Sequence, residues 1–419
     1  MKQDELYPTK EVIIKTTSFQ QNKVVNKVQE HQTITASKKF LRLVALVQKQ
    51  YQSVIGGTGS IPFALRTAVG PAHVFGNKEP DFTITLNNEQ AVAALSTLDQ
   101  NTIIDAYLAG HIDLEGDIMG ALALRELFND NRGLRFLWRF IRPFLFGQVK
   151  SDKKWIASHY DTDAEFFLLF LDERHRAYSQ AIYLHDEESL EDAETRKLDF
   201  ALEAVHAKPG DRILDIGSGW GSLVEYAGKK GIRVTSLTIS KRSQQYVQKL
   251  IDSENLPCRV LLEHFMEHDP GQKYDGIINC GVTEHLPDYA GSLKQYEKLL
   301  KPGGALYLDA SADRVKNAHG SFMGRYVFEG NASLLCLHEY LTEVAKSPFQ
   351  LAGVWDDRHN YYLTTKAWAQ KLDSCREEIE QRWGKQLYRI FRLYLWGSAE
   401  GFDSGMIDAY RVVLRLPEK

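Results

Sequence analysis

The stretch ILDIGSGWG, residues 213–221, decides which fold the sequence predicts. Its first four residues are mostly apolar, as in a buried strand, and three glycines follow, separated by Ser218 and Trp220. Glycine has no side chain, so a turn of this kind lets backbone amides approach a ligand closely. The stretch therefore predicts a strand that ends at a ligand-binding turn.

The chain around this turn alternates between strand-like and helix-like segments. RILDIG, RVTSLTIS, RVLLEHF, DGIINCGV and ALYLDAS are separated by SLVEYAGKKG, KRSQQYVQKLIDSEN and LKQYEKLLKPGG. Such alternation is typical of an α/β fold with a parallel sheet and helices on both faces. Ligands bind over the carboxyl ends of such strands, which we place at Gly217, Thr238, Phe265, Cys280 and Asp309.

Composition describes an ordinary soluble chain. Its 419 residues are 43% hydrophobic and 25% charged, with a formal net charge of −4, which is enough for two domains and implies no nucleic-acid partner. The four cysteines, Cys258, Cys280, Cys336 and Cys375, are scattered, so we expect no metal site and no disulfide framework. The sequence shows no leader peptide and no membrane span. These features favour a cytoplasmic protein.

The chain divides into three parts. Residues 1–35 are polar and poor in core formers, which predicts a mobile tail. Residues 36–150 predict a small mixed domain, with strands in IPFALRTAV and DFTITLNN and helices in TIIDAYLAGHIDL and IMGALALRELF. Residues 151–419 carry the glycine turn and the strand–helix alternation.

Two charged segments call for interpretation. RGLRFLWRFIRPFLFG, residues 132–147, places arginines along one helix face and aromatic residues on an adjoining face. It suits either an anionic membrane surface or a connecting helix packed on the next domain. HDEESLEDAETRK, residues 185–197, is typical of a solvated helix face.

The glycine spacing bears on the cofactor. A dinucleotide fold needs G-x-G-x-x-G, whereas Gly217, Gly219 and Gly221 follow G-x-G-x-G. A cofactor with a nucleoside and an amino-acid tail but no phosphate fits better, and S-adenosylmethionine is that cofactor. The alternative is a tight strand-to-helix turn without a ligand.

Seven separated motifs extend this interpretation in order and spacing. They are HYDTDAEFFLLFLDERHRAYSQAIY (159–183), PGDRILDIGSGWG, RVTSLTIS, TEHLPDYAGSLKQYEKLLKPGG, FMGRYVFEG, NYYLTTKAW and YLWGSAEGFDSG. Together they resemble the cyclopropane-fatty-acid synthase family of S-adenosylmethionine-dependent methyltransferases, from about residue 159 to the C-terminus. PDFTITLNN and AYLAGHIDLEGD resemble the lipid-binding domain that longer members carry. The resemblance implies a class I, Rossmann-like methyltransferase domain over 151–419, preceded by an α+β lipid-binding-like domain over 36–150.

The resemblance also implies the cofactor contacts. These are Tyr178, Ser179, Gly217, Gly219, Thr238, Ser240, Gln244, His264 and Phe265. Ser243 occupies the place of the family's glutamine, and Gln244 comes next. Phe265 could stack on adenine and His264 could hydrogen-bond to it, while a buried structural histidine is the competing interpretation.

The activity that the resemblance implies is methyl transfer onto the double bond of an unsaturated acyl chain of a phospholipid, through a carbocation. In the family a bound bicarbonate is thought to take the final proton. Glu284 and Tyr361 match its cradle, whereas Gln180 stands for a cysteine, Asp309 for a histidine and Ser311 for an isoleucine. We take Glu284, Tyr361, Asp309 and Gln180 as the catalytic candidates.

The aspartate weighs against bicarbonate. Two like charges at ~4 Å and an effective dielectric near 20 repel by ~4 kcal/mol, so Asp309 facing Glu284 would disfavour an anion between them. Either carboxyl could instead take the proton directly, the pair sharing one proton. Alternatively, the negative cavity could hold a cationic or polar substrate. Asp309 could also simply accept backbone hydrogen bonds where its strand stops.

Three functions are therefore compared. The first is acyl-chain methylation, with a phospholipid or membrane surface as partner and a peripheral place on the inner membrane face. The second is C- or N-methylation of a soluble secondary metabolite, since plant alkaloid N-methyltransferases resemble the same family. The third is a catalytically dead lipid-binding protein, which the retained Glu284, Tyr361 and glycine turn disfavour. The sequence allows a homo-oligomer without determining it.

Overall fold

The computed structural model describes residues 38–54, 61–130, 163–316, 322–327 and 333–418. Contacts divide the chain into two compact units, one up to Asn129 and one from Asp130 onward. The predicted polar tail and the basic segment at 132–147 lie outside the described residues. No helix among the described residues is long and apolar enough to cross a membrane.

The first unit is a small α+β fold. After a helix over 38–54, its four strands pair in the order β2-β1-β3-β4. The strands are β1 (Phe63–Thr67), β2 (His73–Phe75), β3 (Phe82–Leu86) and β4 (Ile112–Gly116), and the helices are α2 (Glu89–Ser96), α3 (Gln100–Leu108), α4 (Ile118–Ala123) and η1 (Leu124–Leu127). The buried rings of Phe63, Phe75 and Phe82 stack at its centre.

One element of this unit differs from the prediction. TIIDAYLAGHIDL is not one helix, because α3 ends at Leu108 and strand β4 begins at Ile112. Gly110 adopts a φ of +79°, a left-handed conformation that stops the helix and redirects the chain. The β4 strand then pairs antiparallel with β3, and this pairing overrides the helical pattern of the sequence.

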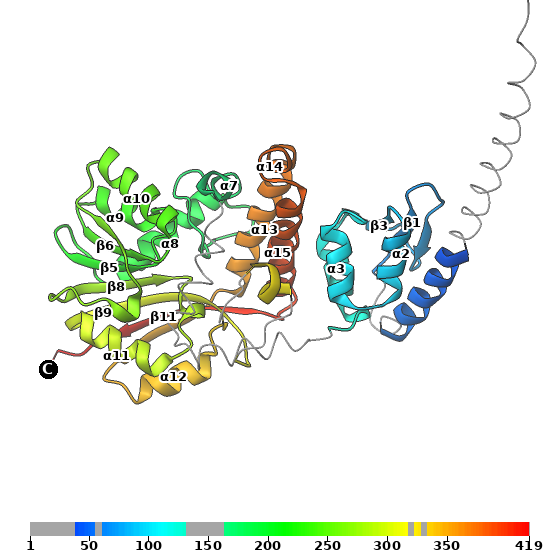
Figure 1. The fold of residues 1–419 in the computed structure, drawn as a ribbon. Coiled ribbons are helices and arrows are strands. Elements are labelled where there is room, and N and C mark those ends of the chain that lie inside the picture. The colour runs from blue at the N-terminus through cyan, green and yellow to red at the C-terminus, as the bar shows by residue number, and fades with distance from the viewer. Residues whose placement is uncertain (1–37, 55–60, 131–162, 317–321, 328–332, 419) are drawn as a thin grey trace, which may run out of the picture. The chain divides into compact units, whose positions relative to one another are not determined.

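The second unit contains a seven-stranded sheet in the order β10-β11-β9-β8-β5-β6-β7 (Figure 1). Five neighbouring strands are parallel, while β11 runs antiparallel to both β9 and β10. The strands are β5 (Arg212–Ile216), β6 (Arg233–Thr238), β7 (Arg259–Leu262), β8 (Tyr274–Cys280), β9 (Leu300–Ala312), β10 (Gln350–Asp356) and β11 (Asp408–Arg415).

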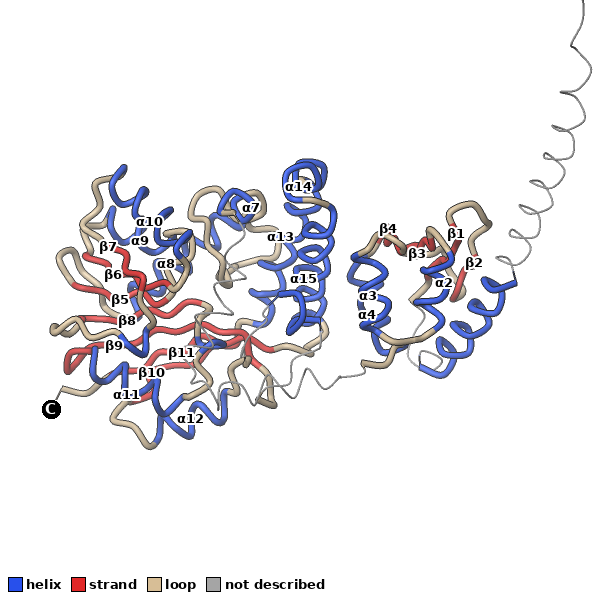
Figure 2. The backbone as a smooth tube through the Cα atoms, in the orientation of Figure 1, coloured by secondary structure: helices blue, strands red, loops and turns tan. Residues whose placement is uncertain are grey.

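Helices cover both faces of this sheet, so the predicted α/β class with its Rossmann-like, mostly parallel sheet is confirmed. Figure 2 shows α8, α9 and α10 over one face and α11 and α12 over the other, and each face has its own apolar core. The helices are α7 (Ala164–Leu168), α8 (Leu190–Ala204), α9 (Ser222–Lys229), α10 (Lys241–Ser253), α11 (Tyr289–Leu299), α12 (Leu337–Ala345), α13 (Arg358–Ser374), α14 (Arg376–Trp383) and α15 (Lys385–Asp403), with short turns η2 (Phe265–Glu267), η3 (Thr283–His285) and η4 (Met323–Val327).

Two predictions about this unit were wrong. Strand β9 does not stop at Asp309 but continues to Ala312, because β11 pairs with it antiparallel as far as the Asp408–Ala312 register. The charged run 185–197 is not a fully solvated face, since Glu194 and Lys197 on α8 are buried. Both differences follow from tertiary contacts that local patterns do not show.

The glycine turn generates a stability prediction. A Cβ at Gly217 would lie 2.4 Å from Cγ2 of Val282, and its φ is +92°. We expect Gly217→Ala to lower the free energy of unfolding by about 3 kcal/mol, combining a backbone penalty of about 1–2 kcal/mol with a steric one of about 1–3 kcal/mol. Gly210→Ala is the control, because Gly210 has a φ of +91° and open space around it. Urea unfolding tests this, and equal losses for both variants would contradict it.

Candidate active site

A cavity opens where β5, β6 and β8 end, beside the turn that follows β7. Eight of the nine expected cofactor contacts line it, namely Tyr178, Ser179, Gly217, Gly219, Thr238, Ser240, His264 and Phe265. Gln244 is not among its lining residues, whereas the neighbouring Ser243 is. The structure therefore brings together residues that are up to 87 positions apart, Tyr178 and Phe265 being the outermost.

Hydrogen bonds fix the glycine turn in an open conformation. The backbone amides of Gly217 and Ser218 both donate to the carbonyl of Leu237, at 3.0 and 2.9 Å. The Ser243 hydroxyl donates to the Gly219 carbonyl at 2.6 Å and lies 2.8 Å from the hydroxyl of Ser218. A Cβ on Gly219 would meet nothing within 4 Å. This open turn fits the close approach of an amino-acid tail and a ribose.

The next strand ends supply polar and apolar walls. The Thr238 hydroxyl accepts from the Ser240 amide at 3.2 Å, and Ser240 caps α10. Nδ1 of His264 accepts from the Met266 amide at 3.2 Å, so a neutral ring carries its proton on Nε2. The buried Phe265 ring is backed by Tyr296, with ring centroids 4.8 Å apart. An N–H donor beside an aromatic face suits an adenine ring.

Lys197 is a cavity residue that the sequence analysis missed. Its ammonium is 2.9 Å from the Ser179 hydroxyl and 3.0 Å from a carboxylate oxygen of Glu194. Burial is the largest effect and disfavours the charge, but Glu194, Cys280 and Asp309 together outweigh it, so the pKa of Lys197 is raised. Burial also raises the pKa of Glu194 to about 8 and that of the nearby Asp215 to about 7. The cavity wall thus contains a buried cation, the Lys197 ammonium, with the carboxyl groups of Glu194 and Asp215 around it.

Glu284 lies next to the cavity, between the lining residues Val282 and His285. One of its carboxylate oxygens accepts from the Ser311 amide at 2.7 Å. The other is buried and has no hydrogen-bond partner among the described residues. Burial raises the pKa of Glu284 to about 7. A carboxyl with this pKa and an open oxygen can exchange a proton near neutral pH.

Tyr361 joins the same group from the first turns of α13. Its hydroxyl interacts with the Ser311 side chain, which also interacts with Glu284. The Tyr361 ring stacks on Phe402, with centroids 4.5 Å apart, and meets the edge of Trp368. Burial raises the pKa of Tyr361 well above its ordinary value, so the hydroxyl stays protonated.

Asp309 is directed at the backbone beside the end of β8. One carboxylate oxygen accepts from the Gly281 amide at 2.9 Å, and the other accepts from the Tyr307 hydroxyl at 3.1 Å. The carboxyl is buried, and burial raises its pKa. It lies close enough to Glu284 to raise the pKa of that group as well. Both oxygens are engaged, which favours a positioning role over proton transfer.

Gln180 is held by Asp357, which is itself held by Arg411, and the sequence analysis missed both residues. Its side-chain amide donates to Asp357 at 2.6 Å, and the same carboxylate oxygen accepts from Arg411 at 2.5 Å. A carboxylate accepts and does not donate, so the amide nitrogen of Gln180 must face it. The Gln180 carbonyl oxygen is buried with no partner among the described residues. Gln180, which stands where the family has a cysteine, therefore offers a hydrogen-bond acceptor, its carbonyl oxygen.

Cys336, His338 and Glu339 form a cluster that the sequence analysis did not expect. Their ligand atoms lie within 4.8 Å of one another, although the cysteines were read as scattered. The Lys316 ammonium is 3.6 Å from Glu339, and this positive charge disfavours a bound cation. The expectation of no metal stays a prediction.

The geometry agrees with what known proteins show. The model of the mycolic acid cyclopropane synthetase family matches residues 148–412. The chain belongs to this family. It is 28% identical over 285 residues to a Mycobacterium tuberculosis protein named probable fatty acid methyltransferase, a match that covers 66% of each chain, just under two thirds of that relative's length. It is 24% identical to the sphingolipid C9-methyltransferase of Komagataella phaffii, covering 81% of this chain and 75% of that one.

Solved structures of the family share the second unit's fold. A cyclopropane synthase from Mycobacterium tuberculosis superposes with a TM-score of 0.59 at 27% identity, covering 63% of this chain and 98% of that one. A mycolic acid cyclopropane synthase complexed with SAH and CTAB has a TM-score of 0.58 at 25% identity, with the same coverage. SAH is the demethylated form of the cofactor predicted from the glycine turn. The protein is thus an S-adenosylmethionine-dependent methyltransferase, as the sequence predicts.

The buried ion pair generates a second prediction. Replacing Lys197 with Met leaves Glu194 without its cation, so we expect a loss of about 3–5 kcal/mol in the free energy of unfolding. The double variant Lys197→Met, Glu194→Gln should recover part of this loss, because it removes both charges. Lys230→Met is the matched control, since Lys230 pairs with Asp199 at 3.0 Å on the surface and should cost less than about 1 kcal/mol.

Denaturant unfolding of the three variants measures these differences. A Lys197→Met loss as small as that of Lys230→Met would mean that the pair is not an essential part of the cavity wall. A double variant that is less stable than Lys197→Met alone would contradict the prediction. It would mean that the loss in Lys197→Met does not come from an unpaired Glu194 charge.

Proposed function

We propose that the enzyme transfers the methyl carbon of S-adenosylmethionine to the double bond of an unsaturated acyl chain of a phospholipid. The observation that carries this proposal is the buried Glu284 carboxyl, with one open oxygen and a pKa of about 7, near Tyr361, which packs on an apolar cluster rich in aromatic rings. The names of the relatives add support, since they act on fatty acids or sphingolipids.

When bound, the cofactor supplies an electrophilic methyl group on a cationic sulfur. The residues that would hold it are the glycine turn, Thr238, Ser240, His264 and Phe265. An alkene is a weak nucleophile, so the protein must align the reactants and exclude water from a carbocation. Buried aromatic rings do both, because their faces attract positive charge. The ring of Tyr178 lies 5.3 Å from that of Trp368, which also contacts Tyr361.

The carbocation must then lose a proton, and Glu284 is the group that we assign to take it. The Ser311 amide holds one oxygen of this carboxylate, which leaves the other for the proton. Asp309 holds the Gly281 backbone at the cavity edge and raises the pKa of Glu284. In this scheme Asp309 is a positioning residue rather than the base.

No bicarbonate is needed in this scheme. The Gln180 carbonyl and the Glu284 carboxylate are hydrogen-bond acceptors, and acceptors repel an anion where donors would bind it. The same acceptors could bind a polar N–H group, which is compatible with the second function, methylation of an amine or another polar group on a soluble metabolite. Coclaurine N-methyltransferase shares the fold with a TM-score of 0.55 at 19% identity, which is a likeness of fold alone.

The proposal includes a lipid surface as the enzyme's partner. Residues 36–150 keep the lipid-binding role that the sequence suggests, and the enzyme would act peripherally on a membrane from the cytoplasmic side. Sheet β2-β1-β3-β4 is the described framework of that unit.

Labelled cofactor and mixed unsaturated phospholipid vesicles test the substrate class. We expect label in the fatty acids released from the extracted lipid, and none when the acyl chains are saturated, because only an alkene can accept the methyl carbon. A cofactor that binds without labelling any fatty acid would contradict the proposal. Label in water-soluble amines added to the same mixture would support the second function.

The role of Glu284 predicts a pH dependence. The ionised form is the base, so kcat/KM should rise with pH up to about 7 and level off above it, following the raised pKa of Glu284. Glu284→Gln should lower kcat by about 10²–10⁴-fold and remove this rise, while cofactor affinity stays within about twofold.

Asp309→Asn is the matched control for that experiment. Asparagine keeps an oxygen for the Gly281 amide, so we expect a smaller loss of kcat and an unchanged cofactor affinity. A larger loss than that of Glu284→Gln would make Asp309 the base. Added bicarbonate should leave the wild-type rate unchanged, and a strong dependence would overturn the assignment of Glu284.

A further inference from the structure

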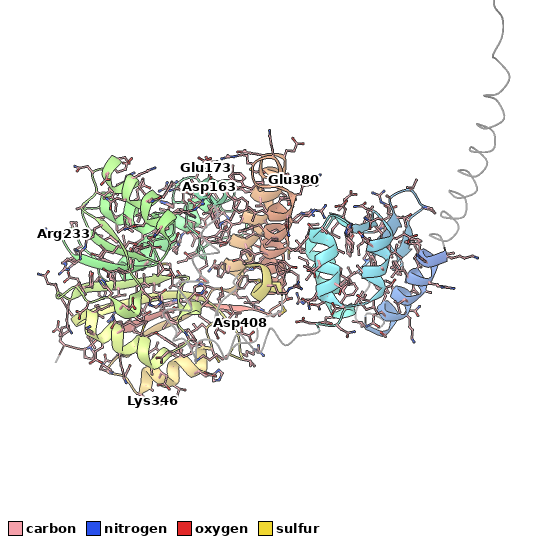
Figure 3. The ribbon with its side chains drawn as sticks, viewed as in Figure 1. Asp163, Glu173, Arg233, Lys346, Glu380 and Asp408 are labelled. Carbon is pink, nitrogen blue, oxygen red and sulfur yellow. The ribbon has the colours of Figure 1, made fainter. Side chains whose placement is uncertain are left out.

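A polar groove lies where β9, β10 and β11 meet, beyond the residues that hold Glu284. It is lined by Asp313, Arg314, Leu337, His338, Asp356, Arg358, Asp408 and Tyr410. Figure 3 labels Asp408 in this region. The groove is separate from the cofactor cavity, which has none of these residues in its lining.

Charges of both signs in the groove are available to a ligand. Neither Arg314 nor Arg358 forms an ion pair within the described part of the chain. Asp313 and Asp356 each use one carboxylate oxygen to accept a neighbouring backbone amide, at 3.1 and 3.0 Å. Positive and negative groups therefore face the same space without neutralising each other.

The tyrosine in the groove shows how close these charges are. Burial raises the pKa of Tyr410, Asp408 and Asp356 raise it further, and Arg314 and Arg358 oppose the rise. Both signs of charge thus act on one hydroxyl. A ligand that matches this lining needs a negative and a positive group a short distance apart.

Exposed apolar side chains flank the groove. Val315 is 64% exposed and Met406 is 49% exposed. The Asp408–Ala312 register brings the segment before β11 next to the segment after β9, so these two side chains lie on neighbouring segments. Apolar side chains beside arginines are typical of a surface that meets a lipid–water interface.

The groove also lies close to the reaction site. Ser311, which donates to Glu284, precedes Asp313 by two residues on the same chain segment. At about 3.3 Å per residue the separation along the strand is about 7 Å. The groove therefore begins within a short distance of the residue that holds Glu284.

We propose that this groove binds the zwitterionic head group of the phospholipid substrate. Arg314 and Arg358 bind the phosphate, and Asp313 and Asp408 bind the ammonium group. The inference rests on the proposed function for the identity of the acyl chain, and it adds the class of lipid that the enzyme selects.

Vesicles of unsaturated phosphatidylethanolamine and of unsaturated phosphatidylglycerol test this inference with the full chain. Arg314→Ala should weaken binding to both vesicles about tenfold, because a charge-assisted hydrogen bond to phosphate is lost. Asp408→Asn should weaken binding to phosphatidylethanolamine alone, since phosphatidylglycerol has no amine. Arg233→Ala is the control, because Arg233 is an exposed residue at the start of β6, far from Asp408 in Figure 3.

Co-sedimentation measures binding, and the KM for vesicle lipid provides a second readout. Wild-type binding by both groove variants would overturn the inference, as would an equal loss in Arg233→Ala, which would indicate general surface charge. If the wild-type protein binds phosphatidylethanolamine as expected but methylates no lipid, the proposed function is wrong, while head-group binding by the groove is still supported. If it methylates the lipid and the groove variants have an unchanged KM, head-group binding by the groove is wrong, while the proposed function is supported.

Discussion

The buried Lys197 ammonium is the constraint on which the rest of the catalytic unit depends. It lies between α8 and the segment that carries Tyr178 and Ser179, and it pairs with Glu194 while contacting the Ser179 hydroxyl. A buried charge is tolerated only when it is paired and hydrogen-bonded. Because Asp309 and Asp215 also interact with this cation, one side chain links the cofactor wall to the strand ends beside Glu284. A second buried pair, Arg411 with Asp357, fixes Gln180 in the same layer.

The sequence predicts well which residues meet at the cavity, because the strand–helix alternation and the glycine turn are local patterns. Once parallel strands are assigned, their ends must meet at one edge, which brought Gly217, Thr238 and Phe265 together as expected. The buried ions could not be predicted in this way. Glu194 and Lys197 lie in a charged run that looks solvated, and their burial depends on contacts with distant segments.

The other features that the sequence did not predict also depend on contacts between distant parts of the chain. Asp357 meets Gln180 across 177 positions of the chain and Arg411 meets Asp357 across 54, and no local spacing marks either contact. The predicted end of a strand at Asp309 was wrong because the last strand, β11, pairs with β9 and extends it. The pairing of β8 with β9 sets Asp309 opposite Cys280 and so beside the Gly281 amide. Long-range strand pairing thus engages the Asp309 carboxylate, while Glu284 keeps one oxygen without a hydrogen-bond partner among the described residues.

We propose that the site has two parts, a cavity wall that would hold the cofactor and an acceptor side where Glu284 takes the proton without a bound anion. Methyl transfer from S-adenosylmethionine with a fully deuterated methyl group is the sharpest test of acyl-chain methylation, by mass spectrometry of the fatty acids released from the lipid. We expect deuterium in the acyl chain, and the number of deuterium atoms retained tells which carbon lost its proton. Deuterium confined to a nitrogen or to a soluble product, with none in the acyl chain, would contradict it.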